Sequence, residues 1–472
     1  MFGLETQIFL LLSFCLLAAC AFEFINGFHD TANAVATVIY TNSLKPTQAV
    51  VWSGIMNFLG VVTGGVGLGM GIVNLLPVDL LIDQNVYHSI AMVLALLFSA
   101  IIWNFGTWYF GIPASSSHTL IGSIIGVGLG YAFLPDSNVG MAAVNWDKAK
   151  EIFTALLLSP VLGFSLSIFL MYLIRRLSSK SVRKEIFGEV EEGKTPPLWI
   201  RAVLITTCTL VSFFHGRNDG QKGIGLVMLI LIGILPTYFA LDTSKNIGEI
   251  KADLIKIEQV IYKIDTTTLG KEDIKKVNKI KENIQILKPI TVAGTLGTTS
   301  MMNVRKSVLV VSSGSKKLLD NENISLSKAD AEILTEAATK EEKGIRSLID
   351  FAPAWAILMI SISLGLGTMI GWKRIVVTVG EKIGKTHLTY AQGAAAEIVA
   401  SITIGLASAY KLPVSTTHTL SSGIAGSMVA SKGIKNLQSK TIKNILMAWV
   451  LTLPVVMALS ATLFIVFRTI LG

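Results

Sequence analysis

Charged residues are scarce in this chain. Only 15% of its 472 residues are Asp, Glu, Lys or Arg, whereas in soluble proteins the share is about a quarter. Hydrophobic residues make up 51%, and the mean hydropathy is +0.62. This composition excludes an ordinary soluble protein. Apolar runs that approach or reach the roughly 17–25 residues needed to cross a bilayer recur along the chain, and they predict an all-α polytopic membrane protein.

The chain also lacks the usual signatures of an enzyme. No Gly-x-Ser-x-Gly elbow and no His-Glu-x-x-His zinc pattern occurs in the sequence. Its three cysteines, Cys15, Cys20 and Cys208, lie inside apolar runs without metal-ligand spacing. We therefore expect a protein that is not an enzyme and uses no cofactor, and the sequence leaves a metal site undecided.

Positive charge is in excess, with a formal net charge of +9, and two clusters of basic residues lie in linkers that directly follow apolar runs. Such clusters at the ends of membrane segments are the positive-inside signal, which predicts cytoplasmic linkers and not nucleic-acid binding. The two clusters are Arg175, Arg176, Lys180, Arg183 and Lys184 after one apolar run, and Lys373, Arg374, Lys382 and Lys385 after another.

A hydroxyl-rich motif occurs twice. Its copies are Pro113-Ala-Ser-Ser-Ser-His-Thr-Leu and Pro413-Val-Ser-Thr-Thr-His-Thr-Leu, each followed by a Gly-rich apolar segment. Proline suits the first turn of a helix, and Ser or Thr can cap free backbone N–H groups. Each copy predicts the polar tip of a helix or re-entrant hairpin. Two such N-termini, converging, would suit a tetrahedral oxyanion.

A second motif is also duplicated and is centred on an aspartate. The copies are Asn26-Gly-Phe-His-Asp-Thr-Ala-Asn and His215-Gly-Arg-Asn-Asp-Gly-Gln-Lys, each directly after an apolar run. An intramembrane aspartate is a functional candidate by default. The flanking glycines and amides predict an unwound helix that exposes carbonyls to a cation. Four of the six histidines, His29, His118, His215 and His418, belong to the two kinds of motif.

The order of these motifs predicts a transporter built from two inverted repeats, with roughly ten to twelve membrane segments. Between residues 242 and 349 charged amphipathic patterns predict a soluble helical insert, which we expect in the cytoplasm. The expected organisation is a first repeat over 1–177, a basic cytoplasmic linker over 178–198, the start of the second repeat over 199–241, the insert over 242–349, and the remainder of the second repeat over 350–472.

Together the motifs resemble those of the inorganic phosphate transporter family, in particular its bacterial low-affinity branch. The resemblance covers both membrane halves and implies an inner-membrane symporter that imports phosphate, alone or as a metal–phosphate complex, driven by protons or sodium. The residues that it implies for the phosphate site are Ser115, Ser116, Thr119, Ser415, Thr416 and Thr419, and those for the cation site are Asp30, Asn33, Asn218 and Asp219.

Two positions depart from the family pattern, which is Gly-Ala-Asn-Asp followed by an Asn three residues later. His29 stands in the place of one Asn, and Lys222 in the place of another. An ammonium group has no acceptor with which to ligate sodium. We therefore expect coupling to protons, carried by Asp30, His29 or Glu397. The competing interpretation is that Lys222 points away and extends to the interface.

Two other functions stay open at this point. A sulfate or other oxyanion permease of similar fold would use the same hydroxyl clusters. A membrane channel or sensor would signal through the insert, although paired aspartates favour stoichiometric coupling. The expected partners are inorganic phosphate and the lipid bilayer, and the sequence leaves a homo-oligomer undecided.

Overall fold

The structure is a computed structural model that describes residues 4–76, 85–135, 140–190, 193–267, 269–296, 300–340 and 342–471. These residues form helices and, apart from one isolated bridge between Gly384 and Leu437, no β-structure. The predicted all-α fold is confirmed. The chain divides into two compact units, which we call the membrane unit (Met1–Val227 with Pro353–Gly472) and the insert unit (Met228–Ala352).

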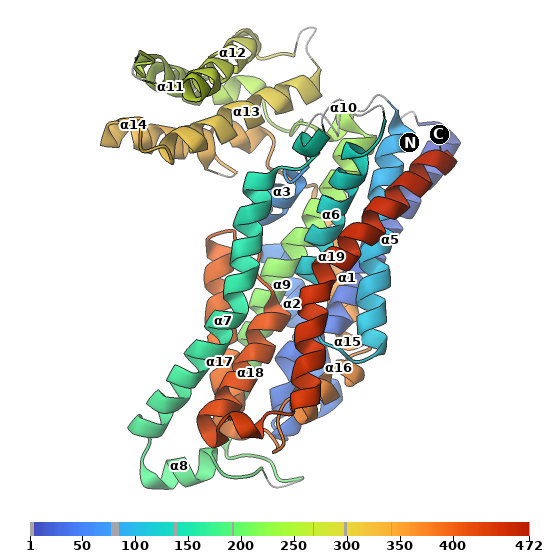
Figure 1. Cartoon of the computed structure of the whole chain (residues 1–472), viewed down its shortest axis with the longest axis vertical. Helices are drawn as coiled ribbons and strands as arrows, with labels where there is room; N and C mark the ends of the chain where they lie inside the picture. Colours follow the sequence, from blue (N-terminus) through green and yellow to red (C-terminus); the bar gives the residue numbers. More distant parts are fainter. Residues whose placement is uncertain are drawn as a thin grey trace. The chain divides into compact units, whose positions relative to one another are not determined.

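The membrane unit contains two sets of helices in matching order (Figure 1). Each set has a long first helix, a bent pair, a hairpin and a long last helix. The first set is α1 (Thr6–Tyr40), α2 (Pro46–Thr63) with α3 (Gly67–Val73), α5 (Val86–Tyr109) with α6 (Ser116–Ala132), and α7 (Trp146–Leu177). The second set is α9 (Leu198–Ile234), whose residues from Met228 on belong to the insert unit, α15 (Ala354–Met369) with α16 (Lys373–Val377), α17 (Tyr390–Ala409) with α18 (Thr416–Lys432), and α19 (Ser439–Leu471).

Among the described residues, six helices are long and apolar enough to cross a membrane, and the two bent pairs raise the number to eight. The bend is 76° between α2 and α3, and 54° between α15 and the helical segment Lys373–Lys382. Gly65 and Gly371 lie at these bends with φ angles of 81° and 75°, which glycine adopts without strain. Counting α6 and α18 as well gives ten, the lower end of the expected ten to twelve segments.

The two sets pack against each other reciprocally. Helix α6 lies along α19, and α18 lies along α7. Gly126 of α6 meets the backbone of Met457 in α19, and Gly426 of α18 meets that of Phe164 in α7. A Cβ would collide at either glycine, so these positions permit close helix packing. Helix α7 runs toward α8 (Lys180–Ile186), whereas α19 runs toward the C-terminus at the opposite end (Figure 1). This arrangement supports the predicted inverted repeat.

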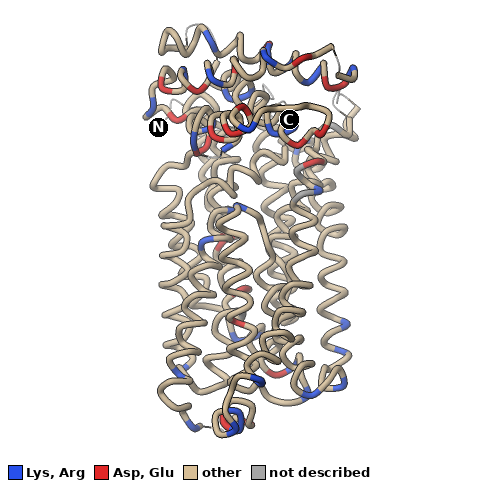
Figure 2. The backbone as a smooth tube through the Cα atoms, turned by 90° about the vertical axis from the view of Figure 1, so that its left-hand side faces the viewer, with Lys and Arg blue, Asp and Glu red and all other residues tan. Residues whose placement is uncertain are grey.

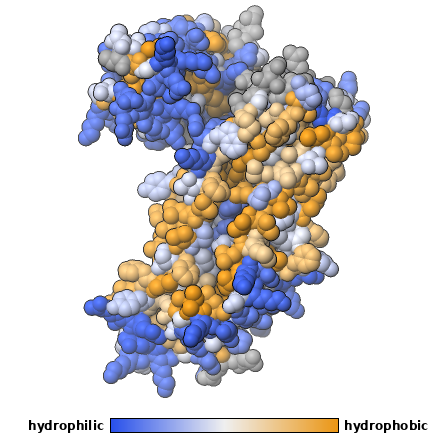
Figure 3. Space-filling model, viewed as in Figure 1, coloured by the Kyte–Doolittle hydropathy of each residue, from blue (hydrophilic) through white to orange (hydrophobic). Residues whose placement is uncertain are grey.

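On the face shown in Figure 3, the surface of the membrane unit is largely apolar above its hydrophilic lower end. Phe169 of α7 and Val450 of α19 are 62% and 72% exposed, which would be costly in water but is favourable in lipid. Figure 2 shows few charged residues along the length of these helices. The predicted polytopic membrane protein is therefore confirmed.

The insert unit is an amphipathic helical unit. Ile257, Ile261 and Ile284 are fully buried in its apolar core. Its helices are α11 (Lys251–Lys263), α12 (Lys271–Ala293), α13 (Met301–Leu319) and α14 (Lys328–Ile333). The spacing of apolar residues around Ile257 and Ile284 predicts α11 and α12, and Ser327 with Asp330 three positions later predicts the start of α14. All three helices are present, and Ser327 caps α14 through the N–H of Asp330 at 3.1 Å. Helix α13 was not expected, although Val304, Val308, Val311 and Leu318 are buried at the same helical spacing as the core residues of α11.

Candidate substrate and cation site

The two hydroxyl motifs form matching helix N-termini. Ser115 is the N-cap of α6 and accepts a hydrogen bond from the N–H of His118 at 3.2 Å. Ser415 is the N-cap of α18 and accepts from the N–H of His418 at 3.1 Å. The two imidazole rings lie 4.6 Å apart between centroids. The tips of both hairpins therefore meet inside the membrane unit.

Two further hydroxyls of the predicted phosphate site are held by their own helices. Thr119 donates to the carbonyl oxygen of Ser115 at 3.0 Å, and Thr419 donates to that of Ser415 at 2.8 Å. Ser115, Thr119 and their counterparts thus shape the helix starts. Ser116 and Thr416, which directly follow the two N-caps, instead face the neighbouring helix α1.

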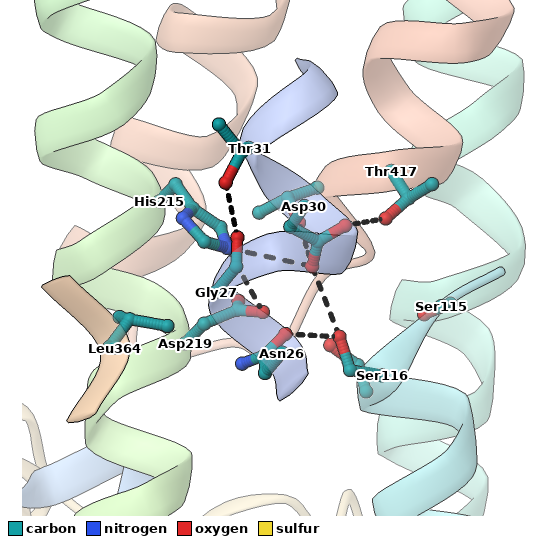
Figure 4. A network of polar contacts seen from close by, with 12 residues as sticks. Asn26, Gly27, Asp30, Thr31, Ser115, Ser116, His215, Asp219, Leu364 and Thr417 are labelled. Atoms are coloured by element: carbon teal, nitrogen blue, oxygen red, sulfur yellow. Dashed lines mark hydrogen bonds and ion pairs between the residues drawn. The ribbon is translucent and has the colours of Figure 1, made fainter. Parts of the chain in front are cut away.

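Asp30 of α1 is the point to which both tips are directed (Figure 4). It is 2% exposed. Ser116 donates to Oδ2 of Asp30 at 3.0 Å and lies 2.5 Å from Oδ1 of Asn26. From the other tip, Thr416 lies 3.5 Å from Oδ2 of Asp30 and Thr417 donates to its Oδ1. The buried carboxylate of Asp30 therefore accepts hydrogen bonds from hydroxyl groups of both repeats.

Lys222 is the second residue of the site on which several polar contacts converge. Its Nζ lies 2.6 Å from Oδ1 of Asp219, one turn earlier in α9, and 2.5 Å from Oγ of Ser117. It also donates to the carbonyl oxygen of Val414 at 3.2 Å. With only 2% of its surface exposed, the lysine faces Asp219 and the hairpin tips and does not extend to the interface. A buried ammonium thus lies between a hydroxyl of the first hairpin tip and a backbone carbonyl of the second.

His215 connects the two aspartates. Its Nε2 lies 3.5 Å from Oδ2 of Asp30 and 3.5 Å from Oδ2 of Asp219, and the three potential ligand atoms lie within 4.8 Å of one another. On the other side of the ring, Nδ1 lies 2.9 Å from Oδ1 of Asn57. The amide Nδ2 of Asn57 donates to Thr368, so its Oδ1 accepts and Nδ1 carries a proton. The Nε2 atom is therefore aimed at the two carboxylates, as in imidazoles that bind cations.

Three of the predicted coupling residues do not join this cluster. His29 lies 3.2 Å from Thr107, Asn218 donates to Ser408 and to the carbonyl of Leu412, and Glu397 accepts from Thr207. Neighbours on a helix point about 100° apart, so His29 and Asn218 cannot share the direction of Asp30 and Asp219. The side chain of Asn33 lies outside the described residues.

The helices at the aspartate motifs also differ from the expected form. Both α1 and α9 run without a break through Asp30 and Asp219, so the predicted unwinding at these motifs was wrong. The glycines serve close packing instead: a Cβ on Gly27 would lie 2.5 Å from the carbonyl oxygen of Leu364 in α15. The breaks occur at the bent pairs and at the hairpin tips.

Sequence reasoning missed His215, Ser117 and Thr417 as members of the site. A signal for each was present in the sequence. Residues four apart on a helix share a face, which places His215 beside Asp219. Ser117 and Thr417 hold the third hydroxyl position of both copies of the motif, so the repeat itself marked them as equivalent.

Comparison with known proteins agrees with this geometry. Residues 26–460 match the model of the phosphate transporter family. The chain is 40% identical to the low-affinity inorganic phosphate transporter PitB of Escherichia coli, over 98% of this chain and 97% of that protein. It is 42% identical to a low-affinity inorganic phosphate transporter of Buchnera aphidicola, over 94% of each.

A solved structure, described as the sodium-dependent phosphate transporter, is similar with a TM-score of 0.55 and 21% identity. The match covers 98% of this chain and 99% of that one, and at this identity it supports the fold. The family match over most of the chain, together with the two relatives, confirms the resemblance seen in the motifs. Because the family and both relatives are transporters, the expectation that the chain is not an enzyme is confirmed as well. The chain belongs to the phosphate transporter family.

Proposed function

We propose that the chain is a secondary active symporter of the inner (plasma) membrane that imports inorganic phosphate together with protons. The observation that carries this proposal is the meeting of two hydroxyl-lined helix N-termini at Asp30 and Lys222. Helix N-termini and an ammonium group favour an anion. Rotation of Ser116, Ser117 and Thr417 away from their present partners would direct three hydroxyls at its oxygens.

The carboxylate of Asp30 adds selectivity to such a site. A carboxylate only accepts hydrogen bonds, and hydrogen phosphate carries a proton to donate, whereas sulfate at neutral pH has none. A buried acceptor without a donor costs roughly 1–3 kcal/mol. We therefore favour phosphate over sulfate, the second oxyanion considered from the sequence.

Lys222 is the reason to favour protons over sodium as the coupling ion. A sodium ion on Asp219 would lie about 5 Å from the ammonium group, and two such charges repel by about 3 kcal/mol at an effective dielectric constant of about 20. The ion pair of Lys222 with Asp219 at 2.6 Å already supplies the positive charge. Buried carboxyl groups such as Asp30 and Glu397 are the proposed proton carriers.

A specific observation favours a metal–phosphate complex as the transported form. The carboxylates of Asp30 and Asp219 with Nε2 of His215 offer three ligand atoms of the kind that divalent cations use. In this version the metal travels as cargo with phosphate, whose negative charge offsets the repulsion by Lys222 that opposes a bare cation on Asp219. His215→Ala would then reduce metal-stimulated uptake more than uptake without added metal.

The test is uptake of labelled phosphate into proteoliposomes with either a sodium or a proton gradient imposed. We expect uptake in sodium-free medium that responds to the pH gradient, and little competition from sulfate. Strict dependence on sodium without a response to pH would contradict proton coupling. Equal competition by sulfate would favour a general oxyanion permease, and flux that no ion gradient can drive uphill would favour a channel.

The order of elements also supports a proposal for the side of the membrane on which the insert lies. Only one candidate span, α9, separates the basic linker of residues 178–198 from the insert, and residues 191 and 192 of that linker lie outside the described residues. A helix that crosses once has its ends on opposite faces, so linker and insert cannot both be cytoplasmic. The basic residues favour the linker, and we propose that the insert lies on the external face.

A further inference from the structure

The membrane unit has a second candidate binding site away from Asp30. It is an open pocket of about 610 Å³ where α5 ends and where the bent span of α15 and α16 ends. Its walls include Trp108, Tyr109, Gly111, Arg374, Thr378 and Lys382. Because both spans end here, the pocket lies at a boundary between lipid and water.

The walls of this pocket are joined by specific contacts. The guanidinium of Arg374 lies 4.9 Å from the ring centre of Tyr109 and 5.2 Å from that of Trp108, and it donates to the carbonyl oxygen of Tyr109 at 2.8 Å. Thr378 donates to the carbonyl oxygen of Gly111 at 2.8 Å. Arg374 is thus held in one orientation, which lowers the entropic cost of binding an anion.

The pocket carries uncompensated positive charge. Within the described part of the chain, Lys373, Arg374 and Lys382 form no ion pair with an acidic residue. All three side chains are exposed and line the pocket. The adjacent acid, Glu381, accepts a hydrogen bond from the hydroxyl of Tyr40 at 2.7 Å. A ligand of this pocket should therefore be an anion.

The rim of the pocket identifies the kind of anion. Phe110, Tyr109 and Ile370 are 75%, 54% and 55% exposed, and large apolar side chains at this level suit acyl chains. Basic pockets between membrane helices on the cytoplasmic side bind the headgroups of anionic lipids. We propose that this pocket binds the phosphate group of an anionic phospholipid headgroup, with the acyl chains along the exposed apolar rim.

The proposal predicts that the protein binds anionic lipid in preference to neutral lipid, and that this preference depends on the lysines of the pocket. The full-length protein is reconstituted in vesicles of phosphatidylcholine with increasing phosphatidylglycerol, one of the two lipids being brominated, and tryptophan quenching gives their relative binding constant. Near an anionic headgroup each basic residue changes affinity by roughly fivefold. Lys373→Gln with Lys382→Gln should therefore lower the preference for phosphatidylglycerol by at least about tenfold.

Two matched variants separate a specific pocket from general charge attraction. Lys440→Gln with Lys443→Gln removes the same charge from exposed positions near the start of α19 and should leave the preference unchanged. Lys373→Arg with Lys382→Arg keeps the charge in the pocket and should retain the preference. Circular dichroism and elution as a single species verify that each variant is folded.

Three results would overturn the assignment. The wild-type protein could show no preference for phosphatidylglycerol, or the α19 control could lose as much preference as the pocket variant. Alternatively, inorganic phosphate at concentrations that saturate uptake could abolish the preference, which would assign the pocket to the free substrate and not to lipid. The proposal does not depend on the coupling ion or on transport, because binding is measured directly.

Discussion

Both the membrane unit and the insert unit have an apolar core, but they differ in their outward surfaces and in the polar cluster that the membrane unit also buries. In the membrane unit, Asp30, His215 and Lys222 lie inside and the outward surface is apolar. In the insert unit, Ile257 and Ile284 lie inside, and the surface is dense in charge (Figures 2 and 3). The surrounding medium explains the difference: lipid solvates apolar surface, so polar groups must find partners within the protein.

The same comparison applies to one buried cation in each unit. Arg305 of the insert unit is fully buried and donates to the carbonyl oxygens of Ala240 and Ile349 at 3.1 and 3.0 Å. Burial lowers the pKa of Arg305 to about 10, and the charge of Asp350 opposes this shift. Arg305 ties segments of the insert unit together, whereas Lys222 compensates Asp219 beside a hydroxyl of one hairpin tip and a backbone carbonyl of the other.

Replacing both cations with methionine should have the largest effect and separate these roles. Lys222→Met leaves Asp219 without its cation, a loss of roughly 3–5 kcal/mol for a buried pair, and should reduce phosphate uptake by about 100-fold or more. Arg305→Met should lower the thermal stability of the insert but keep uptake within about twofold. Uptake and thermal unfolding are measured on both purified variants. Equal loss of uptake would show that the insert shares in the transport site.

A smaller effect should distinguish hydroxyls that shape the hairpin tips from those that face the ligand. Ser115→Ala removes a helix cap and should cost about 1 kcal/mol of stability as well as raise the apparent Km for phosphate. Ser117→Ala removes a partner of Lys222 and should raise Km by roughly tenfold, without the loss of the cap. Ser415→Ala and Thr417→Val are the matched variants in the second repeat.

The readouts for these hydroxyl variants are uptake kinetics and thermal unfolding in the same detergent. A wild-type Km for Ser117→Ala and Thr417→Val, with an altered Km for the cap variants, would contradict phosphate binding by Ser117 and Thr417. It would favour the hydroxyls first expected from the sequence as the phosphate ligands. A wild-type Km for all four variants would remove the hydroxyl motifs from the phosphate site altogether.

The smallest effect is expected from removing most of the insert. The N–H of Asp242 donates to the carbonyl oxygen of Leu348 at 2.8 Å, so the ends of the segment are close enough for a short connection. Replacing Lys245–Lys343 with a Gly/Ser linker should keep phosphate uptake within about twofold. Uptake is compared at equal amounts of correctly inserted protein. Complete loss of uptake would contradict the separation of the two units by function.

The sequence by itself determined the membrane class, the duplicated motifs and the choice of Asp30 and Asp219 as candidate site residues. These features depend on apolar run length and local residue patterns, which are properties of neighbouring positions. The helices α11 and α12 were predictable for the same reason. The glycines of the aspartate motifs led to the wrong prediction of an unwound helix, because glycine is favoured both where a helix unwinds and where two helices pack closely.

Only the tertiary structure decided which polar groups meet. Ser116 and Thr417 reach Asp30 across 86 and 387 positions of the chain, and no local pattern contains that information. The choice of His215 over His29 follows from helix direction, since a side chain four residues away shares a face with Asp219 while an adjacent one does not share that of Asp30. Packing of two repeats into one interior therefore brought the polar groups to a common point, because lipid outside offers them no other partners.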